Sequence, residues 1–339
     1  MLSISVVSIL ITAMVLPLFI SYVFDGWVAK IFSPYYGIKK IPSLTGKWAI
    51  VTGSNTGIGY VTVRELARKG ANVIATTRSA EKGKIAQSKL LKELNGTIGI
   101  GTIEYIELDL SSMKQIKTFA NKVKSKGKNI DIVMLNAGIM MPPFGLTDDG
   151  FEQQIGVNHL GHFVLVKLLN DLIKRSKSRI ISLSSCAHEG PYPEGIRYET
   201  FTSNDSYNPL YAYGQSKLAN ILFANELASR FNGTGVTSNS LHPGMIKTEL
   251  GRYIEEQIKK SFVLTLLSPI FALFNTAMMD TNAGALTQLY VATAPELAGV
   301  TGQYFHPIAR KAKPSLLAQN KTLQKELWDV SEKLTRKFW

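Results

Sequence analysis

The stretch KWAIVTGSNTGIGY, residues 47–60, is the strongest indication of the fold of this chain. Its first part is a short apolar run, and a loop with three glycines, Gly53, Gly57 and Gly59, follows directly. Glycines allow the backbone to turn sharply and to approach a pyrophosphate, which the N-terminus of a following helix stabilises. The spacing is G-x-x-x-G-x-G. Its place between a buried strand and a helix expected from about Tyr60 favours a dinucleotide-binding turn over an ordinary tight turn.

Similar apolar runs recur along the chain, separated by segments of helical length. The expected strands are residues 47–53, 71–77, 102–108, 130–136, 178–184, 235–241 and 302–305. Near-continuous Val, Ile and Leu runs are typical of strands that are buried on both faces of a parallel sheet. Strands that alternate with helices predict an α/β fold, a Rossmann-type doubly wound parallel sheet, in a single domain over residues 45–335.

The composition narrows the class of protein. The 339 residues carry 38 Lys and Arg against 25 Asp and Glu, a formal net charge of +13, and 45% are hydrophobic, which excludes a disordered chain. The single cysteine, Cys186, excludes an intrachain disulfide framework, and the five histidines lack metal-ligand spacing, so no metal is expected. No basic stripe with interleaved aromatic residues is present, so no nucleic-acid partner is expected either.

The first 24 residues contain no charged side chain. As a helix they could cross a hydrocarbon core of about 30 Å, which favours an uncleaved N-terminal transmembrane anchor over a processed targeting segment. Residues 25–44 are then a juxtamembrane linker, whose Tyr36, Lys30, Lys39 and Lys40 suit the headgroup boundary. Because positive charge follows the anchor, the domain is expected to face the cytosol from the endoplasmic reticulum or another organelle membrane.

The second expected strand ends at Thr77 and is followed by Arg78. An acidic residue at this position would bond the ribose 2′-hydroxyl of NAD, and none is present. The Arg78 guanidinium is instead suited to bidentate contact with a 2′-phosphate, and an ordinary solvated arginine is the alternative. NADP(H) is therefore the expected cofactor.

Further motifs follow along the chain, and together with the turn they resemble the short-chain dehydrogenase/reductase family. The matching residues are the TGxxxGIG turn at 52–59, Asp109, Asn136, Ala137, Gly138, Asn158, Ser184, Ser185, Tyr213, Lys217, Pro243, Gly244 and Thr248. The resemblance spans about residues 44–332, and one departure is Leu135, where many members carry a second asparagine. It implies that Asp109 contacts adenine and that residues 136–138 lie beside the adenine ribose.

The Tyr-x-x-x-Lys pattern alone is not specific, because it occurs three times. The pairs are Tyr35/Lys39, Tyr36/Lys40 and Tyr213/Lys217. The first two precede the nucleotide turn and are interpreted as interfacial residues of the linker. Tyr213 and Lys217 open an expected helix, where a spacing of four puts both side chains on one face, downstream of the strand that bears Ser185.

The resemblance implies a catalytic set of Asn158, Ser185, Tyr213 and Lys217. Tyr213 would exchange the proton that hydride transfer to a carbonyl requires, and Ser185 Oγ would bond the reacting oxygen. The Lys217 ammonium is expected to lower the pKa of Tyr213 from about 10, and Asn158 would hold a water that joins Lys217 to solvent. Taken singly, the serine could serve only to cap a turn, and Asn158 could serve only to form a hydrogen bond with a buried backbone group. The residues expected to bind the cofactor are Gly53, Ser54, Asn55, Thr56, Gly57, Ile58, Gly59, Arg78, Asp109, Asn136, Ala137, Gly138, Tyr213, Lys217, Pro243, Gly244 and Thr248.

Several features are similar to the retinol-dehydrogenase-like branch of this family. Ser185 and Tyr213 are 28 positions apart, and prolines between them indicate an inserted loop rather than a longer helix. The stretch from residue 301 to 334 fits that branch too. His188, three residues after Ser185, is expected to be a structural histidine rather than an acid–base group, and a redox role for Cys186 is disfavoured.

Residues 252–279 are expected to form an apolar lid over the substrate, because positions 261–279 carry no charge. A lid that dips into the bilayer is favoured, and a true membrane span and a buried core helix stay open. Such a lid suits a lipophilic alcohol or carbonyl compound, such as a retinoid, sterol or prenyl compound. The expected function is NADP(H)-dependent interconversion of that alcohol and its aldehyde or ketone beside membrane lipid. A catalytically silent NADP-binding scaffold or redox sensor is the alternative, and a homodimer stays open.

Overall fold

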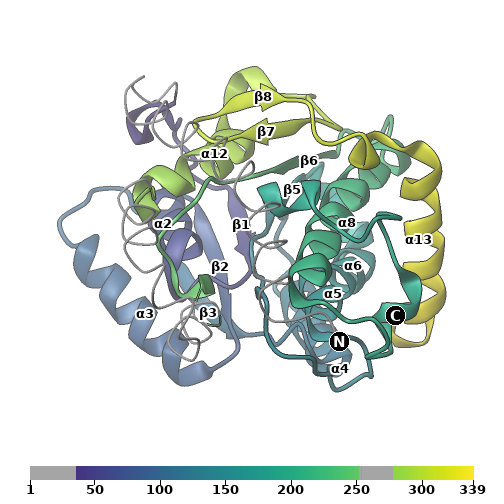
Figure 1. The fold of residues 1–339 in the computed structure, drawn as a ribbon. Coiled ribbons are helices and arrows are strands. Elements are labelled where there is room, and N and C mark those ends of the chain that lie inside the picture. Colours follow the sequence, from purple (N-terminus) through teal and green to yellow (C-terminus); the bar gives the residue numbers. More distant parts are fainter. Residues whose placement is uncertain (1–35, 252, 254–277) are drawn as a thin grey trace, which may run out of the picture.

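The computed structural model describes residues 36–251, 253 and 278–339. Within them lies an eight-stranded sheet of order β3-β2-β1-β4-β5-β6-β7-β8 (Figure 1). The strands are β1 (Trp48–Val51), β2 (Asn72–Thr77), β3 (Ile103–Glu107), β4 (Ile132–Leu135), β5 (Arg179–Leu183), β6 (Thr237–Leu241), β7 (Tyr304–His306) and β8 (Arg310–Ala312). Neighbouring strands are parallel except β7 and β8. The predicted Rossmann-type parallel sheet is confirmed, and β8 is an antiparallel edge strand that was not predicted.

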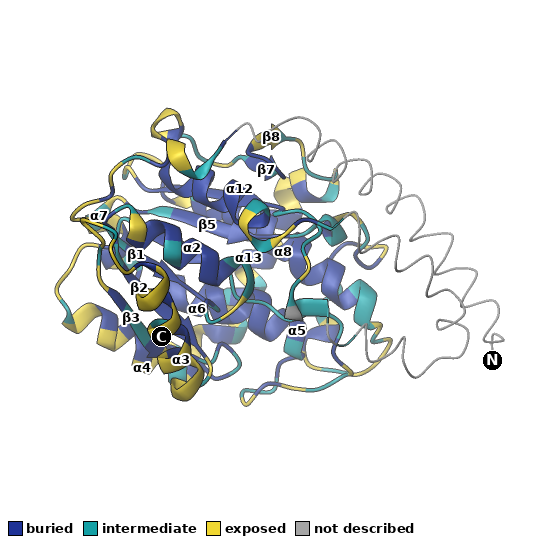
Figure 2. Cartoon of the chain, turned by 90° about the vertical axis from the view of Figure 1, so that its left-hand side faces the viewer, coloured by how far each residue is buried: buried dark blue, intermediate teal, exposed yellow. Residues whose placement is uncertain are grey.

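Helices cover both faces of this sheet, as Figures 1 and 2 show. The α-helices are α2 (Gly57–Arg68), α3 (Ala80–Glu93), α4 (Met113–Ser125), α5 (Gln153–Ile155), α6 (Gly161–Leu168), α7 (Asn170–Ser176), α8 (Pro209–Arg230), α12 (Thr281–Thr293) and α13 (Lys321–Thr335). Short 3₁₀ helices are η1 (Ile38–Lys40), η3 (Cys186–Glu189), η4 (Tyr198–Phe201), η5 (Glu249–Gly251), η6 (Pro295–Leu297), η7 (Leu317–Gln319) and η8 (Arg336–Phe338). Helices α2, α3 and α12 contribute to the core on one face, and α4, α6, α8 and α13 to the core on the other.

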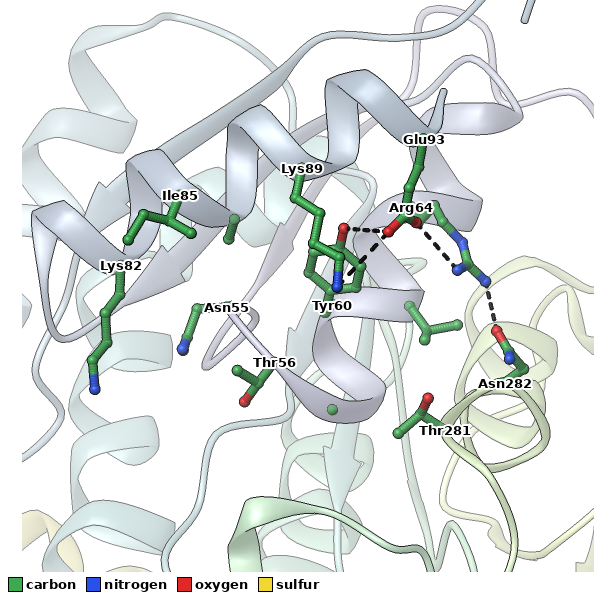
Figure 3. Close-up of a pocket in the computed structure, with 13 residues that line it drawn as sticks. Asn55, Thr56, Tyr60, Arg64, Lys82, Ile85, Lys89, Glu93, Thr281 and Asn282 are labelled. Atoms are coloured by element: carbon green, nitrogen blue, oxygen red, sulfur yellow. Dashed lines mark hydrogen bonds and ion pairs between the residues drawn. The ribbon is translucent and has the colours of Figure 1, made fainter. Parts of the chain in front are cut away.

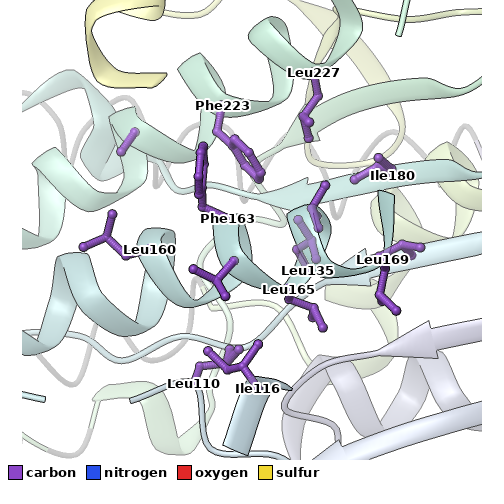
Figure 4. Packing of buried hydrophobic residues seen from close by; sticks show 14 of the residues in the cluster. Leu110, Ile116, Leu135, Leu160, Phe163, Leu165, Leu169, Ile180, Phe223 and Leu227 are labelled. Atoms are coloured by element: carbon purple, nitrogen blue, oxygen red, sulfur yellow. The ribbon is translucent and has the colours of Figure 1, made fainter. Parts of the chain in front are cut away.

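The alternation of side chains along the buried strands explains the two cores. In β1, Ile50 belongs to one hydrophobic cluster, while Ala49 and Val51 belong to the other. Successive side chains of a strand point to opposite faces, so a strand apolar at every position needs helices on both. Figure 4 shows Phe163 and Phe223 within the first cluster. The loops at the carboxyl ends of the strands remain available for binding.

The segment between Ser185 and α8 is the loop that the prolines predicted, with only η3 and η4 as short helical turns. Helix α8 starts at Pro209, four residues before Tyr213, where the sequence interpretation placed its start. The side chain of Asn208 accepts hydrogen bonds from the N–H groups of Leu210 and Tyr211, and proline is favourable at the first helical position. Tyr213 therefore lies within an established helix rather than at its end.

Tyr36 does not have the interfacial role that we expected from the linker. It is 3% exposed, its ring packs edge-on against Tyr290 of α12 at 4.9 Å, and its hydroxyl is hydrogen-bonded to Thr293 Oγ1 at 3.0 Å. Ile41 and Leu44 are buried in the same core. The interpretation of Tyr36 was wrong because its ring fills space in the core that sequence spacing does not reveal.

The expected anchor, residues 1–24, lies outside the described residues. So do residues 25–35 of the expected linker, with Lys30 and Tyr35, and residues 252 and 254–277 of the expected lid. Over residues 36–251 and 278–339, the structure contains no helix that combines the length and the hydropathy needed to span a membrane.

Candidate active site

The loop between β1 and α2 has the backbone conformation that its glycines allow. Gly53 and Gly57 both have φ of +61°, in the left-handed region that favours glycine. A Cβ on Gly53 would lie 2.8 Å from Ala137, and one on Gly59 would lie 2.5 Å from Asn136 Nδ2. Helix α2 begins at Gly57, three residues earlier than predicted, so its positive dipole end directly follows the turn. The turn thus packs closely against the residues that follow β4.

Hydrogen bonds between β1 and β4 hold the turn in place. Asn136 Nδ2 donates to the carbonyls of Thr52 at 2.8 Å and Gly53 at 3.0 Å. Thr52 Oγ1 accepts from the backbone N–H groups of Asn136 at 2.9 Å and Ala137 at 3.0 Å. Thr52 is absent from our predicted site residues, although it belongs to the glycine motif. Its buried hydroxyl thereby connects the end of β1 to the residues that follow β4.

Residues from distant strands complete this region. Tyr105 in β3 donates to the Ser54 carbonyl at 2.7 Å, a contact that no sequence motif indicated because only sheet pairing brings β3 to the turn. A Cβ on Gly57 would lie 3.5 Å from Thr248 Cγ2, so the loop after β6 reaches the same place. In that loop Gly244 follows Pro243 with φ of +102°.

A cavity of about 500 Å³ opens beside the turn, between α2, α3 and the start of α12 (Figure 3). Asn55 and Thr56 form its wall on the side of the turn, and Lys82 lines it from α3. Arg64 is paired with Glu93 at 3.4 Å in the same cavity. The space beside the turn is therefore polar and rich in cations.

Arg78 and Asp109 lie at the same edge of the sheet as the turn. Arg78 directly follows β2 and is exposed. Asp109 follows β3, and its Oδ1 accepts from the N–H of Ser111 at 2.8 Å and from its hydroxyl at 2.7 Å. The carboxyl ends of parallel strands meet at one edge, so the topology brings Arg78, after the neighbouring strand β2, and Asp109, after β3 one strand further, to the edge at which β1 ends.

Ser185, Tyr213 and Lys217 meet where β5 ends beside α8. Ser185 caps η3, with its Oγ accepting from the N–H of Ala187 at 3.2 Å, and its side chain lies close enough to Tyr213 to influence the pKa of that residue. Lys217 Nζ lies 5.6 Å from the centroid of the Tyr213 ring and donates to the Leu183 carbonyl at 3.3 Å. Tyr213 is 5% exposed and Lys217 4%. Three of the four expected catalytic side chains are thus together, with Tyr213 and Lys217 buried and Ser185 half-buried.

Burial controls the protonation of both titratable groups. It raises the pKa of Tyr213 above its usual range, with a further increase from Cys186 and an opposing effect of the Ser185 side chain. Burial lowers the pKa of Lys217 to about 8. The expected lowering of the Tyr213 pKa is therefore wrong for this structure, because desolvation of the phenolate dominates. Tyr213 carries its proton at neutral pH.

Asn158 lies in a π-helical segment, η2 (Gly156–Leu160), a feature often found at functional sites. Its Oδ1 accepts from the Ile139 N–H at 2.8 Å, and its Nδ2 donates to the Ile139 carbonyl at 3.0 Å and to Ser216 Oγ at 2.9 Å. A Cβ on Gly138 would lie 3.2 Å from Asn158 Oδ1 and 3.3 Å from Lys217 Nζ. Asn158 and Lys217 therefore flank Gly138.

His188 is a structural histidine, as expected. Its Nε2 accepts from the Ser315 N–H at 3.1 Å, so its Nδ1 donates to the Ser185 carbonyl at 2.7 Å. Burial lowers its pKa to about 4, which keeps the ring neutral. In the part of the chain that the structure describes, no group of three or more His, Cys, Asp or Glu residues could hold a metal ion.

The fold and these motifs have counterparts in known proteins. A family model described as short chain dehydrogenase matches residues 47–201. Human retinol dehydrogenase 13 is 42% identical over 295 residues, covering 86% of this chain and 85% of that protein. Human retinol dehydrogenase 14 is 39% identical over 298 residues, covering 85% of each chain.

Solved structures agree with this relationship. The crystal structure of an uncharacterized protein from Mycobacterium paratuberculosis has a TM-score of 0.69 and 32% identity, covering 89% of this chain and 97% of that one. The Pseudomonas aeruginosa RhlG/NADP active-site complex has a TM-score of 0.58 and 23% identity, covering 81% of this chain and 97% of that one, and shows the likeness of fold. The identity to the retinol dehydrogenases over most of both chains means that this chain belongs to the short-chain dehydrogenase/reductase family and is retinol-dehydrogenase-like.

Proposed function

We propose that the chain is an NADP(H)-dependent oxidoreductase that interconverts a lipophilic alcohol and its aldehyde or ketone. The observation that carries the proposal is the grouping of the buried Tyr213 with the buried Lys217, whose Nζ lies 5.6 Å from the Tyr213 ring centroid, and with Ser185 at the end of β5. An acid–base hydroxyl next to a second hydroxyl suits a carbonyl oxygen that gains or loses a proton. The likeness to retinol dehydrogenases supports alcohol and carbonyl interconversion.

The residues at the turn fit a dinucleotide cofactor. Gly53 and Gly57 have the left-handed backbone that a sharp turn around a pyrophosphate requires, and the N-terminus of α2 favours a negatively charged group there. Arg78 offers a cation at the end of β2 where NAD-binding relatives of this fold place an acid, so it would hold the 2′-phosphate of NADP(H). The other proposed cofactor residues are Ser54, Asn55, Thr56, Gly57, Ile58, Gly59, Asp109, Asn136, Ala137, Gly138, Tyr213, Lys217, Pro243, Gly244 and Thr248. When bound, NADP(H) supplies or accepts a hydride.

The side chains of this protein would manage the proton. Because burial keeps Tyr213 protonated at neutral pH, its hydroxyl is in the form that donates a proton to a carbonyl oxygen during reduction. Ser185 Oγ would bond the same oxygen and orient it. Lys217, with a pKa of about 8, has a suitable strength to restore the proton on Tyr213. Asn158 would hold its π-helical segment against the loop after β4 through its two hydrogen bonds to the Ile139 backbone.

The direct test replaces Tyr213. We expect Tyr213→Phe to lower kcat by about 10²- to 10⁴-fold, because the variant lacks only the transferable proton. NADPH oxidation by the purified protein, with a panel of retinal, ketosteroids and aliphatic aldehydes, measures this. Tyr198→Phe is the matched control, since the Tyr198 hydroxyl is buried without a hydrogen-bond partner among the described residues. Equal turnover by wild type and Tyr213→Phe on every accepted substrate would contradict the mechanism.

A protein that binds NADPH tightly but turns over nothing on a broad lipid panel would instead be a silent NADP-binding scaffold or a redox sensor. The retention of Tyr213 and Lys217 as buried neighbours, with the half-buried Ser185 at the end of β5, argues for catalysis. Binding of NADPH, followed by its fluorescence, separates the two outcomes.

Membrane attachment is part of the proposal and rests on the uncharged residues 1–24. We expect the full chain to stay with membranes after carbonate extraction and a chain lacking residues 1–24 to be released. If the domain faces the cytosol, the exposed Asn95 in its Asn-Gly-Thr sequon carries no glycan in cells. Glycan at Asn95 would show the opposite orientation.

A further inference from the structure

His162 is a buried histidine of α6 that no motif indicated. It is 2% exposed, and both ring nitrogens are within hydrogen-bond distance of a partner. Nδ1 lies 3.1 Å from the Asn158 carbonyl oxygen, and Nε2 lies 3.0 Å from Thr52 Oγ1. One partner therefore belongs to the segment that bears Asn158, and the other to the residue that precedes the cofactor turn.

The chemistry of these partners determines the direction of each hydrogen bond. A carbonyl oxygen only accepts, so Nδ1 must donate to Asn158. Burial lowers the pKa of His162 to about 4, so the ring is neutral and Nε2 accepts the Thr52 hydroxyl proton. Thr52 Oγ1 is then free to accept the N–H groups of Asn136 and Ala137. The Met134 carbonyl, 3.3 Å from the same hydroxyl, is the longer of its two acceptor contacts.

The path continues beyond Asn158 in the same donor-to-acceptor sense. Asn158 Nδ2 donates to Ser216 Oγ at 2.9 Å, and Ser216 Oγ donates to the Tyr213 carbonyl at 2.8 Å. Ser216 is fully buried and Asn158 likewise. A series of buried, directional hydrogen bonds thus joins Thr52 at the cofactor turn to the backbone of Tyr213, and within it His162 connects Thr52 to Asn158.

We propose that His162 is a positioning residue that fixes the π-helical segment bearing Asn158 relative to the cofactor turn. It does this by donating to the Asn158 carbonyl and accepting from Thr52. The roles of Asn158 and Tyr213 in catalysis rest on the proposed function. The hydrogen bonds of His162 that connect the turn to residues 156–160 do not depend on that function.

The chain provides a matched control in His159, which lies in η2 itself. It is 1% exposed, and its Nε2 is hydrogen-bonded to Ser331 Oγ of α13 at 2.8 Å. Its ring packs against Phe223 with a centroid distance of 5.5 Å. His159 and His162 are therefore similar in burial, but only His162 is bonded toward the cofactor turn.

The experiment compares His162→Leu, His162→Gln and His159→Leu in the full chain. NADPH should slow amide hydrogen exchange both at residues 52–59 and at residues 153–161 in the wild type and in His159→Leu. In His162→Leu the slowing should be confined to residues 52–59. We expect kcat of His162→Leu to fall by about 10- to 100-fold through misplacement of the reacting groups, with the KM for NADPH changed less than kcat.

His162→Gln retains an amide acceptor for Thr52 and should recover part of both effects, and it also serves if His162→Leu does not fold. The proposal is overturned if NADPH slows exchange at 153–161 equally in the wild type and the His162 variants, or if it never slows exchange there. Equal kcat in His162→Leu and His159→Leu would overturn it as well. A wild type without turnover would contradict the proposed function, while the exchange data would still decide the role of His162.

Discussion

The glycine turn at residues 52–59, the proposed cofactor site, and the proposed catalytic cluster lie at the same edge of the sheet but are constructed differently. The turn is contiguous, residues 52–59, and its shape comes from glycines with left-handed backbone and from the start of α2. The cluster collects Asn158, Ser185, and the helical pair Tyr213 and Lys217 from three segments of the chain, and side-chain hydrogen bonds hold Asn158 and Lys217 in place. The conformation of the turn therefore depends mainly on steric fit, whereas the arrangement of the cluster depends on polar groups that are removed from water.

The two regions also differ in their histidine content. Residues 45–135, which build the cofactor turn, contain no histidine. Four histidines in the other part of the domain have a pKa lowered by burial: His159 and His242 to about 3, His162 and His188 to about 4. A fall in pH should therefore first destabilise the part of the domain that holds these histidines and the proposed catalytic residues.

The largest expected effect is a loss of stability between pH 7 and pH 5. An unfolded histidine takes up a proton below about pH 6.5, whereas these buried ones do not, so unfolding binds protons and the free energy of unfolding falls as the pH falls. Each histidine contributes about 2 kcal/mol over this interval. Glu152, whose pKa burial raises to about 7, acts in the opposite direction by about 2 kcal/mol.

Urea unfolding at the two pH values measures the net effect. In His159→Asn the pH dependence should be smaller by about 2 kcal/mol. Hydrogen exchange should accelerate at residues 156–163 before it does in β1 and α2. A free energy of unfolding that does not change from pH 7 to pH 5 would contradict the assignment.

The next effect concerns the turn. Gly53→Ala should cost about 2 kcal/mol and weaken NADPH binding by about 30-fold, because the residue would keep a left-handed φ and its Cβ would meet the Ala137 backbone at 2.8 Å. The dissociation constant of NADPH and the unfolding free energy measure it. Gly96→Ala is the control for backbone conformation alone, since Gly96 has φ of +79° with nothing within 4 Å of its Cβ position. Equal losses in the two variants would exclude a steric cause.

The smallest effect concerns cofactor choice. Arg78→Ala should weaken NADPH binding by about 10-fold and leave NADH binding nearly unchanged, because the guanidinium would bond only the 2′-phosphate. Titration with both cofactors measures the ratio. Arg175→Ala, an exposed arginine on α7, controls for the loss of one positive charge. A parallel loss for NADH would argue against the proposed role of Arg78.

Most of the fold and the identity of the catalytic candidates could be predicted from the sequence. The apolar runs are local signals, and all seven expected strands are present. Strand β8 was missed because Arg310–Ala312 pairs only as an edge, with exposed and polar residues. Tyr36 was misplaced because an aromatic residue near lysines looks the same at a membrane boundary and in a core.

The turn, the parallel sheet and the family could be predicted from the residues alone, because glycine spacing and apolar patterning act over neighbouring residues. Only the tertiary structure decided the protonation of Tyr213, where desolvation outweighs the influence expected of Lys217. Only the tertiary structure placed Tyr105 at the turn and His162 between Thr52 and Asn158. Such contacts join residues far apart in the chain, and their strength depends on the exclusion of water, which no local pattern records.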